Sequence, residues 1–496
     1  MLYASTRDAA CTANGPEAIL KGIAPDGGLF TPVDFSDMRI DMEKILKMNA
    51  VEISAEVIGK LLPDFSPEEM RALITAAYEG KFSAPDLTPV VKVGDDFVLE
   101  LFRGPTSAFK DVALSVLPRL ITAGRAKVGM KEEIVILTAT SGDTGKAALE
   151  GFRDVPGTRI IVFYPDGGVS DVQKAQMATQ QGANVDVVAV KGNFDDAQTG
   201  VKRIFADDGA NGWAAASGVR LSSANSINLG RLAPQVAYYF KSYADLVNRG
   251  EIKNGEKINF CVPTGNFGDI LAGEFARRMG LPVGRLICAS NANNVLTDFI
   301  RTGVYDRVRD FKKTVSPSMD ILVSSNLERY LLLLTDYDHA FVAEKMRELN
   351  EKGVYDIGSA LTEKMGGLFS AYCADDKEAL RIISEVWTKY GYLLDTHTAA
   401  GWSAMEQFHA EGGNGLKTVV LATASPYKFA KAVLGAISDD VPEDGFEAME
   451  ALRAKTGTEI PKNLAALKGQ AHRFTRVIAK EDMRDYVRAS VSAKAD

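Results

Sequence analysis

The sequence predicts an α/β protein with two open-sheet lobes and a small N-terminal domain. From about Leu99 onward, short β-branched apolar segments alternate with helical segments, and a second stretch of this kind begins near Ile227. The apolar segments do not alternate strictly with polar residues, which indicates strands buried on both faces of a helix-covered parallel sheet. Open sheets of this type bind ligands beyond the carboxyl ends of their strands.

The elements of the two lobes follow from hydrophobic periodicity. In the first stretch we expect strands at 133–139, 159–164 and 184–190 and helices at 146–152, 170–180 and 195–205. In the second we expect strands at 257–262, 285–289 and 418–422 and helices at 227–247, 269–279 and 428–437. Pro118 should kink or break the helix after Lys110, because an interior proline removes a backbone hydrogen bond.

Three domains are expected along the chain. Residues 1–92 form the small N-terminal domain, with helical periodicity at 42–60 and 67–78. Residues 93–440 hold both lobes, interleaved, and residues 441–496 form a C-terminal extension without a motif of its own.

Composition and charge exclude several classes of protein. The chain has 496 residues and a formal net charge of -8, and without a basic run neither nucleic acid nor a membrane is an expected partner. No window approaches the ~18 consecutive apolar residues of a membrane span. The four cysteines form no CxxC pair and the four histidines show no metal-ligand spacing with them, so no metal site is expected. We therefore expect reduced thiols and a cytoplasmic location.

Residues 100–111 carry the first candidate site residue. The turn at Gly104-Pro105 leads into a helix with Lys110 in its first turns. The helix dipole disfavours a cation there, and burial would lower the pKa of the amine further, as a nucleophilic lysine needs. Taken alone, a solvated helix lysine is the commoner alternative.

Two glycine-containing loops each follow a predicted strand and open a helix. Residues 138–145 read Thr-Ala-Thr-Ser-Gly-Asp-Thr-Gly, and residues 263–269 read Pro-Thr-Gly-Asn-Phe-Gly-Asp. Backbone N–H groups at such helix starts suit a carboxylate or a phosphate, although neither loop is a Walker A or G-x-G-x-x-G motif. A capped helix start and a tight turn are the alternatives. Two such loops favour a bipartite ligand that carries phosphate.

These three segments together resemble the threonine synthase family of fold type II pyridoxal-phosphate enzymes. Further blocks of that family occur in its order over roughly residues 1–440, at 24–30, 223–228 with Arg231, 317–321, 325–329, 397–400 and 422–426. The resemblance implies that 93–440 is the catalytic region, with the two-lobed fold type II architecture and pyridoxal 5'-phosphate as cofactor.

The resemblance also implies roles for individual residues. Lys110 corresponds to the lysine that forms the Schiff base and then moves protons. The other cofactor-binding residues are Gly265, Asn266, Phe267 and Gly268 in the phosphate loop, Asp269 beside that loop, and Thr423 at the pyridine nitrogen. The substrate-binding residues are Ser141, Gly142, Asp143 and Thr144 for the α-carboxylate and Asn225, Ser226 and Arg231 for the phosphate. Taken singly, Thr423 could end a strand and Arg231 could be an exposed structural arginine.

The implied activity is a carbon–oxygen lyase reaction of threonine biosynthesis. It converts O-phospho-L-homoserine and water into L-threonine and phosphate by γ-elimination and β-addition of water. The alternatives are a related phospho-lyase that gives 2-oxobutyrate and a non-catalytic ligand-binding relative. The expected partner is the small-molecule substrate, bound by a monomer or a dimer of the chain.

Overall fold

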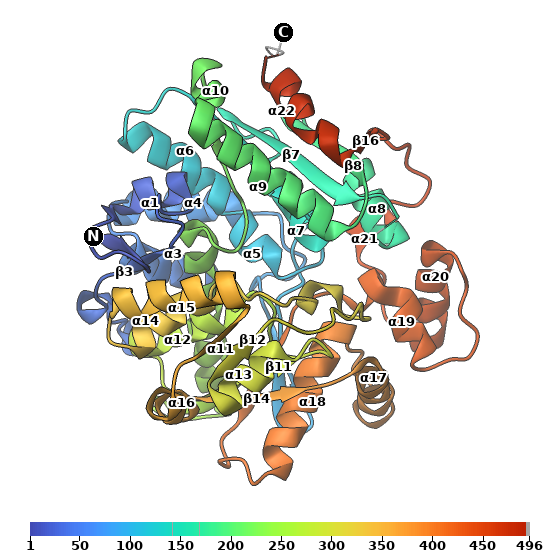
Figure 1. The fold of residues 1–496 in the computed structure, drawn as a ribbon. Coiled ribbons are helices and arrows are strands. Elements are labelled where there is room, and N and C mark those ends of the chain that lie inside the picture. The colour runs from blue at the N-terminus through green and yellow to red at the C-terminus, as the bar shows by residue number, and fades with distance from the viewer. Residues whose placement is uncertain (141, 168, 493–496) are drawn as a thin grey trace.

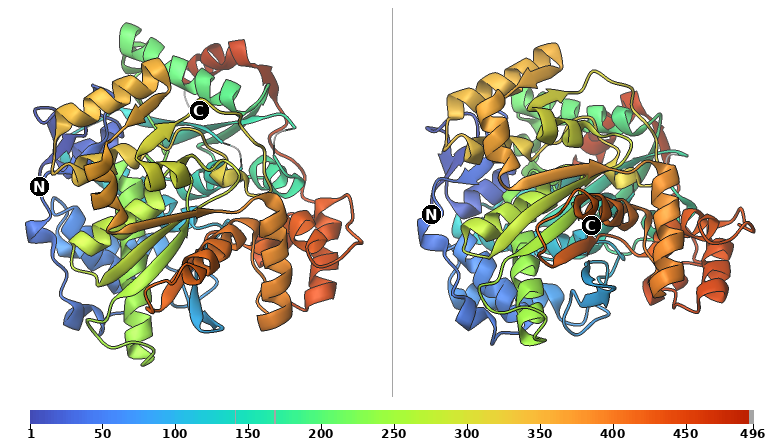
Figure 2. Two further views of the ribbon diagram at one scale, coloured as in Figure 1. Left: turned by 60° about the horizontal axis from the view of Figure 1, so that its bottom comes forward. Right: turned by 90° about the horizontal axis from the view of Figure 1, so that it is seen from below.

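The computed structural model describes residues 1–140, 142–167 and 169–492, apart from the side chains of residues 194, 195, 210 and 211. Its two larger sheets form two lobes, which lie one above the other in Figure 1, with the N-terminal segment along one side. The predicted α/β class with two open-sheet lobes is confirmed. Figure 2 shows the helices that flank the six-stranded sheet, which is the lower of the two in Figure 1.

The first lobe is a parallel sheet with the strand order β16-β8-β7-β6-β9. Its strands are β6 (Glu133–Ala139), β7 (Thr158–Pro165), β8 (Val185–Lys191), β9 (Val219–Ser222) and β16 (Val477–Ala479). Its helices are α7 (Asp143–Phe152), α8 (Asp171–Ala178), α9 (Phe194–Asn211), α10 (Trp213–Ala216) and α22 (Met483–Ser492). Ile136 of β6 shares a buried cluster with Leu149 of α7, whereas Val135 shares one with Val201 of α9. Both faces of the sheet are therefore covered, which explains the unbroken apolar strands.

The second lobe has the strand order β14-β11-β10-β15-β5-β4, in which only the β4–β5 pair is antiparallel. Its strands are β4 (Val90–Val93), β5 (Asp96–Glu100), β10 (Ile258–Pro263), β11 (Val283–Ser290), β14 (Phe369–Cys373) and β15 (Thr418–Ala422). Its helices are α11 (Leu229–Asn248), α12 (Gly268–Arg278), α13 (Val295–Thr302), α17 (Asp376–Tyr390), α18 (Thr396–Ala410) and α19 (Ala430–Gly435). Phe260 packs edge-on against Tyr239 of α11, while the next residue, Cys261, donates to the Gly401 carbonyl of α18. Helices thus cover both faces of this sheet as well.

The N-terminal segment packs against both lobes. It holds β1 (Tyr3–Ser5), β2 (Thr12–Ala13), β3 (Phe30–Pro32), η1 (Ser36–Met38), α1 (Gly15–Lys21), α2 (Met42–Ile45), α3 (Ala50–Leu61) and α4 (Pro67–Tyr78). Ser66 caps α4 and Pro67 occupies its first turn, as the sequence predicts. Tyr78 at the end of α4 donates to the Val112 carbonyl at 2.9 Å, which ties this segment to the helix that begins at Lys110.

Two helices follow in place of one after Lys110, α5 (Lys110–Leu114) and α6 (Leu117–Lys127). Pro118 lies in the first turn of α6, where its missing N–H costs no helix bond, so the predicted break is confirmed. The prediction of a single helix at 428–437 is wrong, because the structure has two shorter helical elements there. The chain forms η3 (Pro426–Phe429) and then α19, because Phe429 leaves helical geometry with φ -122° and ψ 34°.

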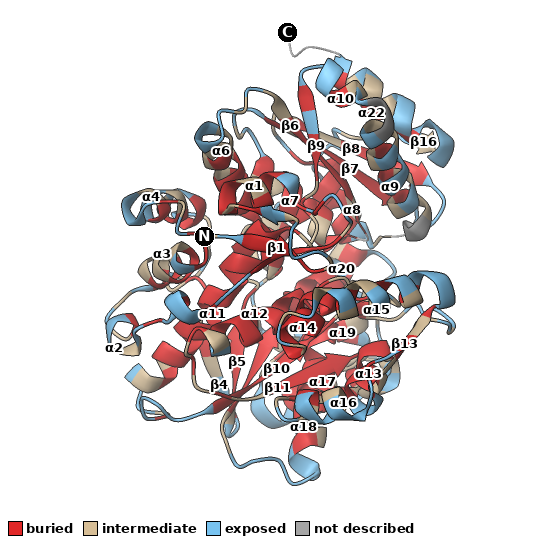
Figure 3. Cartoon of the chain, turned by 60° about the vertical axis from the view of Figure 1, so that its left-hand side comes forward, coloured by how far each residue is buried: buried red, intermediate tan, exposed pale blue. Residues whose placement is uncertain are grey.

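The remaining elements lie outside the predicted set. Those before α17 are β12 (Val304–Asp306), η2 (Pro317–Met319), α14 (Leu327–Leu334), α15 (His339–Lys352), β13 (Val354–Asp356) and α16 (Ser359–Gly366). Those after α19 are α20 (Gly445–Thr456), α21 (Lys462–Ala465) and η4 (Lys480–Asp482). The C-terminal segment returns to the first lobe, where β16 pairs with β8. Figure 3 shows the sheets buried and the outer helix faces exposed. Within the described ranges, no helix has the length and apolar character needed to cross a bilayer.

Candidate active site

A cavity of about 320 Å³ opens where strands of both lobes end. β6 ends at Ala139, β10 at Pro263 and β15 at Ala422, and a cavity-lining segment follows each of them. The predicted site residues that line it are Lys110, Asp143, Thr144, Asn225, Ser226, Arg231, Gly265, Asn266, Phe267, Gly268, Asp269 and Thr423. The fold thus brings separate parts of the sequence together at strand ends, where open α/β sheets bind ligands.

Lys110 is the first residue of α5, and its side chain lies inside the protein. Only 9% of the residue is exposed, and Nζ lies 3.5 Å from Oγ of Ser318. Burial lowers the pKa of Lys110 to about 8. The carboxylate of Asp143 opposes this shift, and the cations of Lys428 and Arg231 add to it. A neutral amine therefore forms close to neutral pH, as a nucleophilic lysine requires.

The loop after β10 presents backbone to the cavity and its aromatic ring to the core. Phe267 has a φ of 61°, and its ring lies 5.9 Å from that of Tyr330 and 5.7 Å from that of Phe369. A Cβ on Gly265 would lie 2.9 Å from the carbonyl oxygen of Ser318. Only glycine fits there without movement of the facing backbone.

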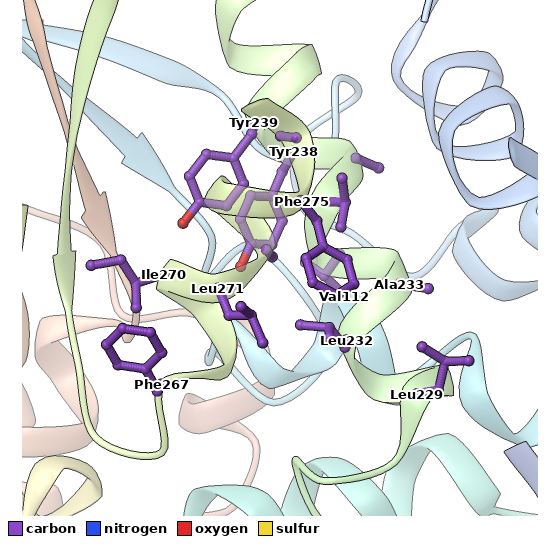
Figure 4. Packing of buried hydrophobic residues seen from close by; sticks show 14 of the residues in the cluster. Val112, Leu229, Leu232, Ala233, Tyr238, Tyr239, Phe267, Ile270, Leu271 and Phe275 are labelled. Carbon is purple, nitrogen blue, oxygen red and sulfur yellow. The ribbon is translucent and has the colours of Figure 1, made fainter. Parts of the chain in front are cut away.

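Asp269 lies in the first turn of α12 and is held by two tyrosines of α11. Tyr239 donates to its Oδ1 over 3.1 Å, and Tyr238 donates to the same oxygen. Figure 4 shows both rings beside α12 in the buried cluster. Burial raises the pKa of Asp269 to about 7, while the two tyrosine hydroxyls lower it. This carboxyl group can therefore donate or accept a hydrogen bond near neutral pH.

Thr423 directly follows β15 and lies beside the lysine segment. Its carbonyl oxygen accepts the N–H of Phe109 at 2.8 Å, and Ala108 forms an antiparallel bridge with Ala424. These contacts place Thr423 next to Lys110, although the two are far apart in the sequence.

The start of α7 is the loop predicted for a carboxylate. Ser141 lies outside the described residues. Gly142 caps the helix with a φ of 139° and donates to Oγ1 of Thr140 at 2.9 Å, shaping the turn without lining the cavity. Asp143 and Thr144 follow as the first helical residues and line the cavity. N–H groups at a helix start favour an anion there.

Asn225, Ser226 and Arg231 lie together between β9 and the first turn of α11. Arg231 is 2% exposed, which excludes an exposed structural arginine. Its Nη1 donates to the carbonyl of Ala224 at 2.5 Å. Burial lowers the pKa of Arg231 to about 10, so the guanidinium remains a cation near neutral pH.

Three further buried or part-buried residues belong to the site, and no individual role was predicted for them. Ser318 and His397 line the cavity, and the Ser318 N–H donates to Nε2 of His397 at 3.2 Å. Lys428 Nζ lies 2.7 Å from Oδ1 of Asp143. His397 lies in a block that resembles the family. The sequence does not show that its side chain, and not that of a neighbouring residue, contacts Ser318; the tertiary structure does. For Lys428, the sequence offers one signal of a role in the site: it lies just after the turn that follows a predicted strand.

Three family models match the chain. "Threonine synthase N terminus" matches residues 2–78, and "Threonine synthase, C-terminal" matches residues 398–487. "Pyridoxal-phosphate dependent enzyme" matches residues 88–424, which span the cavity-lining segments. The chain belongs to the threonine synthase family. Its family cofactor is pyridoxal 5'-phosphate.

Members of the threonine synthase family resemble the chain over most of its length. The threonine synthase of Pseudomonas aeruginosa is 38% identical over 438 residues, 87% of this chain and 90% of that protein. Threonine synthase-like 1 of Homo sapiens is 39% identical over 433 residues, and the match covers 85% of this chain but 58% of that longer protein. The crystal structure of PLP-bound threonine synthase from Brucella melitensis has a TM-score of 0.87 and 35% identity, with 100% of both chains covered.

The cavity of this threonine synthase family member fits the family cofactor. Within the described part of the chain, Oδ2 of Asp269 and Nε of Arg231 are buried polar atoms without a hydrogen-bond partner. Leaving such an atom unpaired costs about 1–3 kcal/mol, which a ligand that pairs with it can recover. The missing side chain of Gly265 lets its loop lie close against the backbone of Ser318, which lines the same cavity. The donor set, an amine, a guanidinium and helix-start N–H groups, suits a phosphate-bearing ligand.

Proposed function

We propose that the chain is a threonine synthase that converts O-phospho-L-homoserine and water into L-threonine and phosphate. The observation that carries this proposal is the convergence of a buried lysine, two helix starts and a buried arginine on one cavity. The identity of 38% to the threonine synthase of Pseudomonas aeruginosa, over 90% of that protein, supports it.

We assign the loop after β10 and Thr423 to the cofactor. The residues assigned to its phosphate are Gly265, Asn266, Phe267 and Gly268, with Phe267 contributing backbone because its ring is in the core. Asp269 lies beside this loop and is assigned to the cofactor as well. Thr423 is assigned to the ring nitrogen, where a neutral hydroxyl does not enforce protonation. When bound, pyridoxal phosphate stores the electron pairs released at the substrate carbons.

Lys110 is the residue that we assign to cofactor attachment and to proton transfer. A pKa of about 8 leaves an appreciable neutral fraction of its amine, which can take the proton from Cα of the substrate and, after releasing that proton, the proton from Cβ. The same amine, once protonated, can return a proton to Cγ after phosphate leaves. Ser318 Oγ, 3.5 Å from Nζ, limits where the amine can point.

Two anion subsites account for the substrate's ends. We assign its carboxylate to the start of α7, with Ser141, Gly142, Asp143 and Thr144, and its phosphate to Asn225, Ser226 and Arg231. A substrate without phosphate leaves the buried guanidinium of Arg231 without a counter-charge among the described residues and its Nε without an acceptor, which costs binding free energy. Plain homoserine is therefore expected to be a poor substrate, and comparable kcat/KM values for the two compounds would contradict the phosphate subsite.

The product decides between this proposal and a related phospho-lyase. The protein loaded with cofactor is incubated with O-phosphohomoserine, and threonine and 2-oxobutyrate are both quantified. Threonine as the main product supports the proposal, whereas 2-oxobutyrate as the main product replaces it with the phospho-lyase.

Lys110→Ala tests the chemistry, and also the alternative of a non-catalytic relative. The wild-type protein should show an absorbance band near ~410–420 nm that borohydride removes, and the variant should lack both the band and product formation. Wild-type protein without the band after addition of cofactor would favour the non-catalytic relative. Full activity in the variant would exclude Lys110 from the mechanism.

We also propose the coarser organisation of the protein. Residues 1–92 form the N-terminal domain, 93–440 the catalytic region and 441–496 a C-terminal extension, a division supported at its first boundary by the family models that match 2–78 and 88–424. The partner is the small-molecule substrate, bound by a monomer or a dimer. The location proposed is the cytoplasm, in keeping with the free cysteines Cys11, Cys261, Cys288 and Cys373.

A further inference from the structure

Lys428 and Asp143 form an ion pair in the interior, at the edge of the cavity. Lys428 Nζ lies 2.7 Å from Oδ1 of Asp143, and 0% and 3% of the two side chains are exposed. Gln173 donates to the same carboxylate oxygen at 2.9 Å. Lys428 also donates to the carbonyl of Thr106 at 3.0 Å, on the segment that leads into Lys110. One ammonium group therefore joins α7, η3 and the lysine segment.

The position of Asp143 poses an electrostatic problem. It is the first residue of α7, where the helix-start N–H groups suit the carboxylate of the proposed substrate. A second, uncompensated carboxylate at that point would repel the substrate. It would also stabilise the protonated form of the Lys110 amine, which lines the same cavity.

The pair with Lys428 removes this problem. Burial alone would raise the pKa of Asp143, but the cations of Lys428 and Lys110 lower it well below its ordinary value. The carboxylate is therefore ionised, and its charge is balanced by Lys428 at hydrogen-bonding distance. With the charge of Asp143 balanced, burial and the nearby cations disfavour the charged form of the Lys110 amine.

We propose that Lys428 is a positioning residue that neutralises Asp143, so that the start of α7 accepts the substrate's carboxylate and the Lys110 amine is free to react. This role rests on the proposed function for the identity of the substrate. In this arrangement the Asp143 side chain pairs with Lys428, and the backbone N–H of the same residue is available to the substrate's carboxylate.

Three variants test the role: Lys428→Gln, Asp143→Asn and the double variant. Lys428→Gln leaves a buried carboxylate without its partner, and KM for O-phosphohomoserine should rise about 10–100-fold. The double variant removes both charges, so its KM should be at least about tenfold lower than that of Lys428→Gln. Asp143→Asn leaves the Lys428 ammonium group buried without its partner, and it measures what loss of the pair costs when no repelling carboxylate remains. Lys431→Gln is the matched control, because its ion pair with Glu443 is exposed.

Capture of cofactor by the cofactor-free protein gives a readout that does not depend on turnover. Lys110 is faced by Asp143, Asp111, Lys428 and Arg231. In Lys428→Gln the unpaired Asp143 should move the pH midpoint for appearance of the borohydride-sensitive band upward, and the double variant should return it. If Lys428 had only a structural role, the pH midpoint would not return to the wild-type value in the double variant.

The outcomes are distinct. Equal KM increases in Lys428→Gln and Asp143→Asn, or a double variant as impaired as Lys428→Gln, would overturn the proposal. If Lys428→Gln does not fold by circular dichroism, the double variant still decides through the pH midpoint for cofactor capture. A midpoint well above the wild-type value in the double variant, which has no Asp143 carboxylate, rejects the proposal. If the wild type does not turn over O-phosphohomoserine, the proposed function fails, while the pH midpoints still test the pair.

Discussion

The main-chain N–H of Ser318 donates to Nε2 of His397 over 3.2 Å. Because Nε2 accepts, the ring proton lies on Nδ1, which is 3.0 Å from Oδ1 of Asp395. Asp395 is itself the N-cap of α18 and is 1% exposed. The helix start thus orients the imidazole, and the imidazole holds the turn that places the Ser318 hydroxyl against Lys110.

Replacing His397 should therefore slow turnover of O-phosphohomoserine, although Lys110, the proposed nucleophile, is unchanged. In His397→Ala the turn at Ser318 loses its anchor, and kcat is expected to fall about 10–100-fold because small displacements of reacting groups are costly. Steady-state kinetics with O-phosphohomoserine measures the effect. His409→Ala is the control, since that side chain is 40% exposed and lies on the far end of α18. Unchanged kcat in His397→Ala would exclude this positioning role.

The pH dependence of cofactor capture should report the Lys110 amine. Its pKa of about 8 means that the neutral, reactive fraction rises with pH and levels off above about pH 8–9. Stopped-flow absorbance of the cofactor-free protein mixed with pyridoxal phosphate measures this rate across pH 6–10. A rate that still rose steeply between pH 9 and pH 10, as expected for the ordinary lysine value of 10.5, would show that burial has not lowered the pKa of Lys110.

Asp269 should make the cofactor-free protein less stable as the pH rises. Its pKa in the folded state is about 7, above the ordinary 3.8, so both states are protonated at low pH and the folded state resists ionisation above pH 4. The penalty grows until about pH 7 and then levels off. Asp269→Asn removes it, and the free energy of unfolding of the variant relative to the wild type should be higher at pH 8 than at pH 4 by about 1–4 kcal/mol. Urea titrations at the two pH values measure this difference, and an equal effect at both would contradict it.

Gly265 should tolerate no side chain. In Gly265→Ala the new Cβ meets the Ser318 carbonyl at 2.9 Å, so the loop or the facing turn must move. The Kd for pyridoxal phosphate is expected to rise by about tenfold or more, which spectroscopic titration measures. Gly366→Ala is the matched control, because a Cβ there meets nothing within 4 Å. Equal affinities in the two variants would show that the loop is not in contact with the cofactor.

Much of the fold was predictable from local patterns. The strands at 133–139 and 418–422 begin and end where the apolar runs do, because buried parallel strands need unbroken apolar residues. β16 was not predictable: its residues 477–479 are exposed or half-buried and pair with β8 only through the chain's return to the first lobe. Three-residue strands carry too few side chains for a periodic signal.

The sequence by itself determined the two-lobed class and the two glycine loops that follow strands and open helices, because turns, caps and apolar runs act between near neighbours. It made Lys110 a candidate only through the resemblance to a family. Only the tertiary structure decided which polar groups pair. Lys428 with Asp143, and Ser318 with His397, are contacts between residues far apart in the chain. Burial at the junction of the lobes then lowers the pKa of Lys110. Such effects depend on desolvation and distance in three dimensions, which no local pattern encodes.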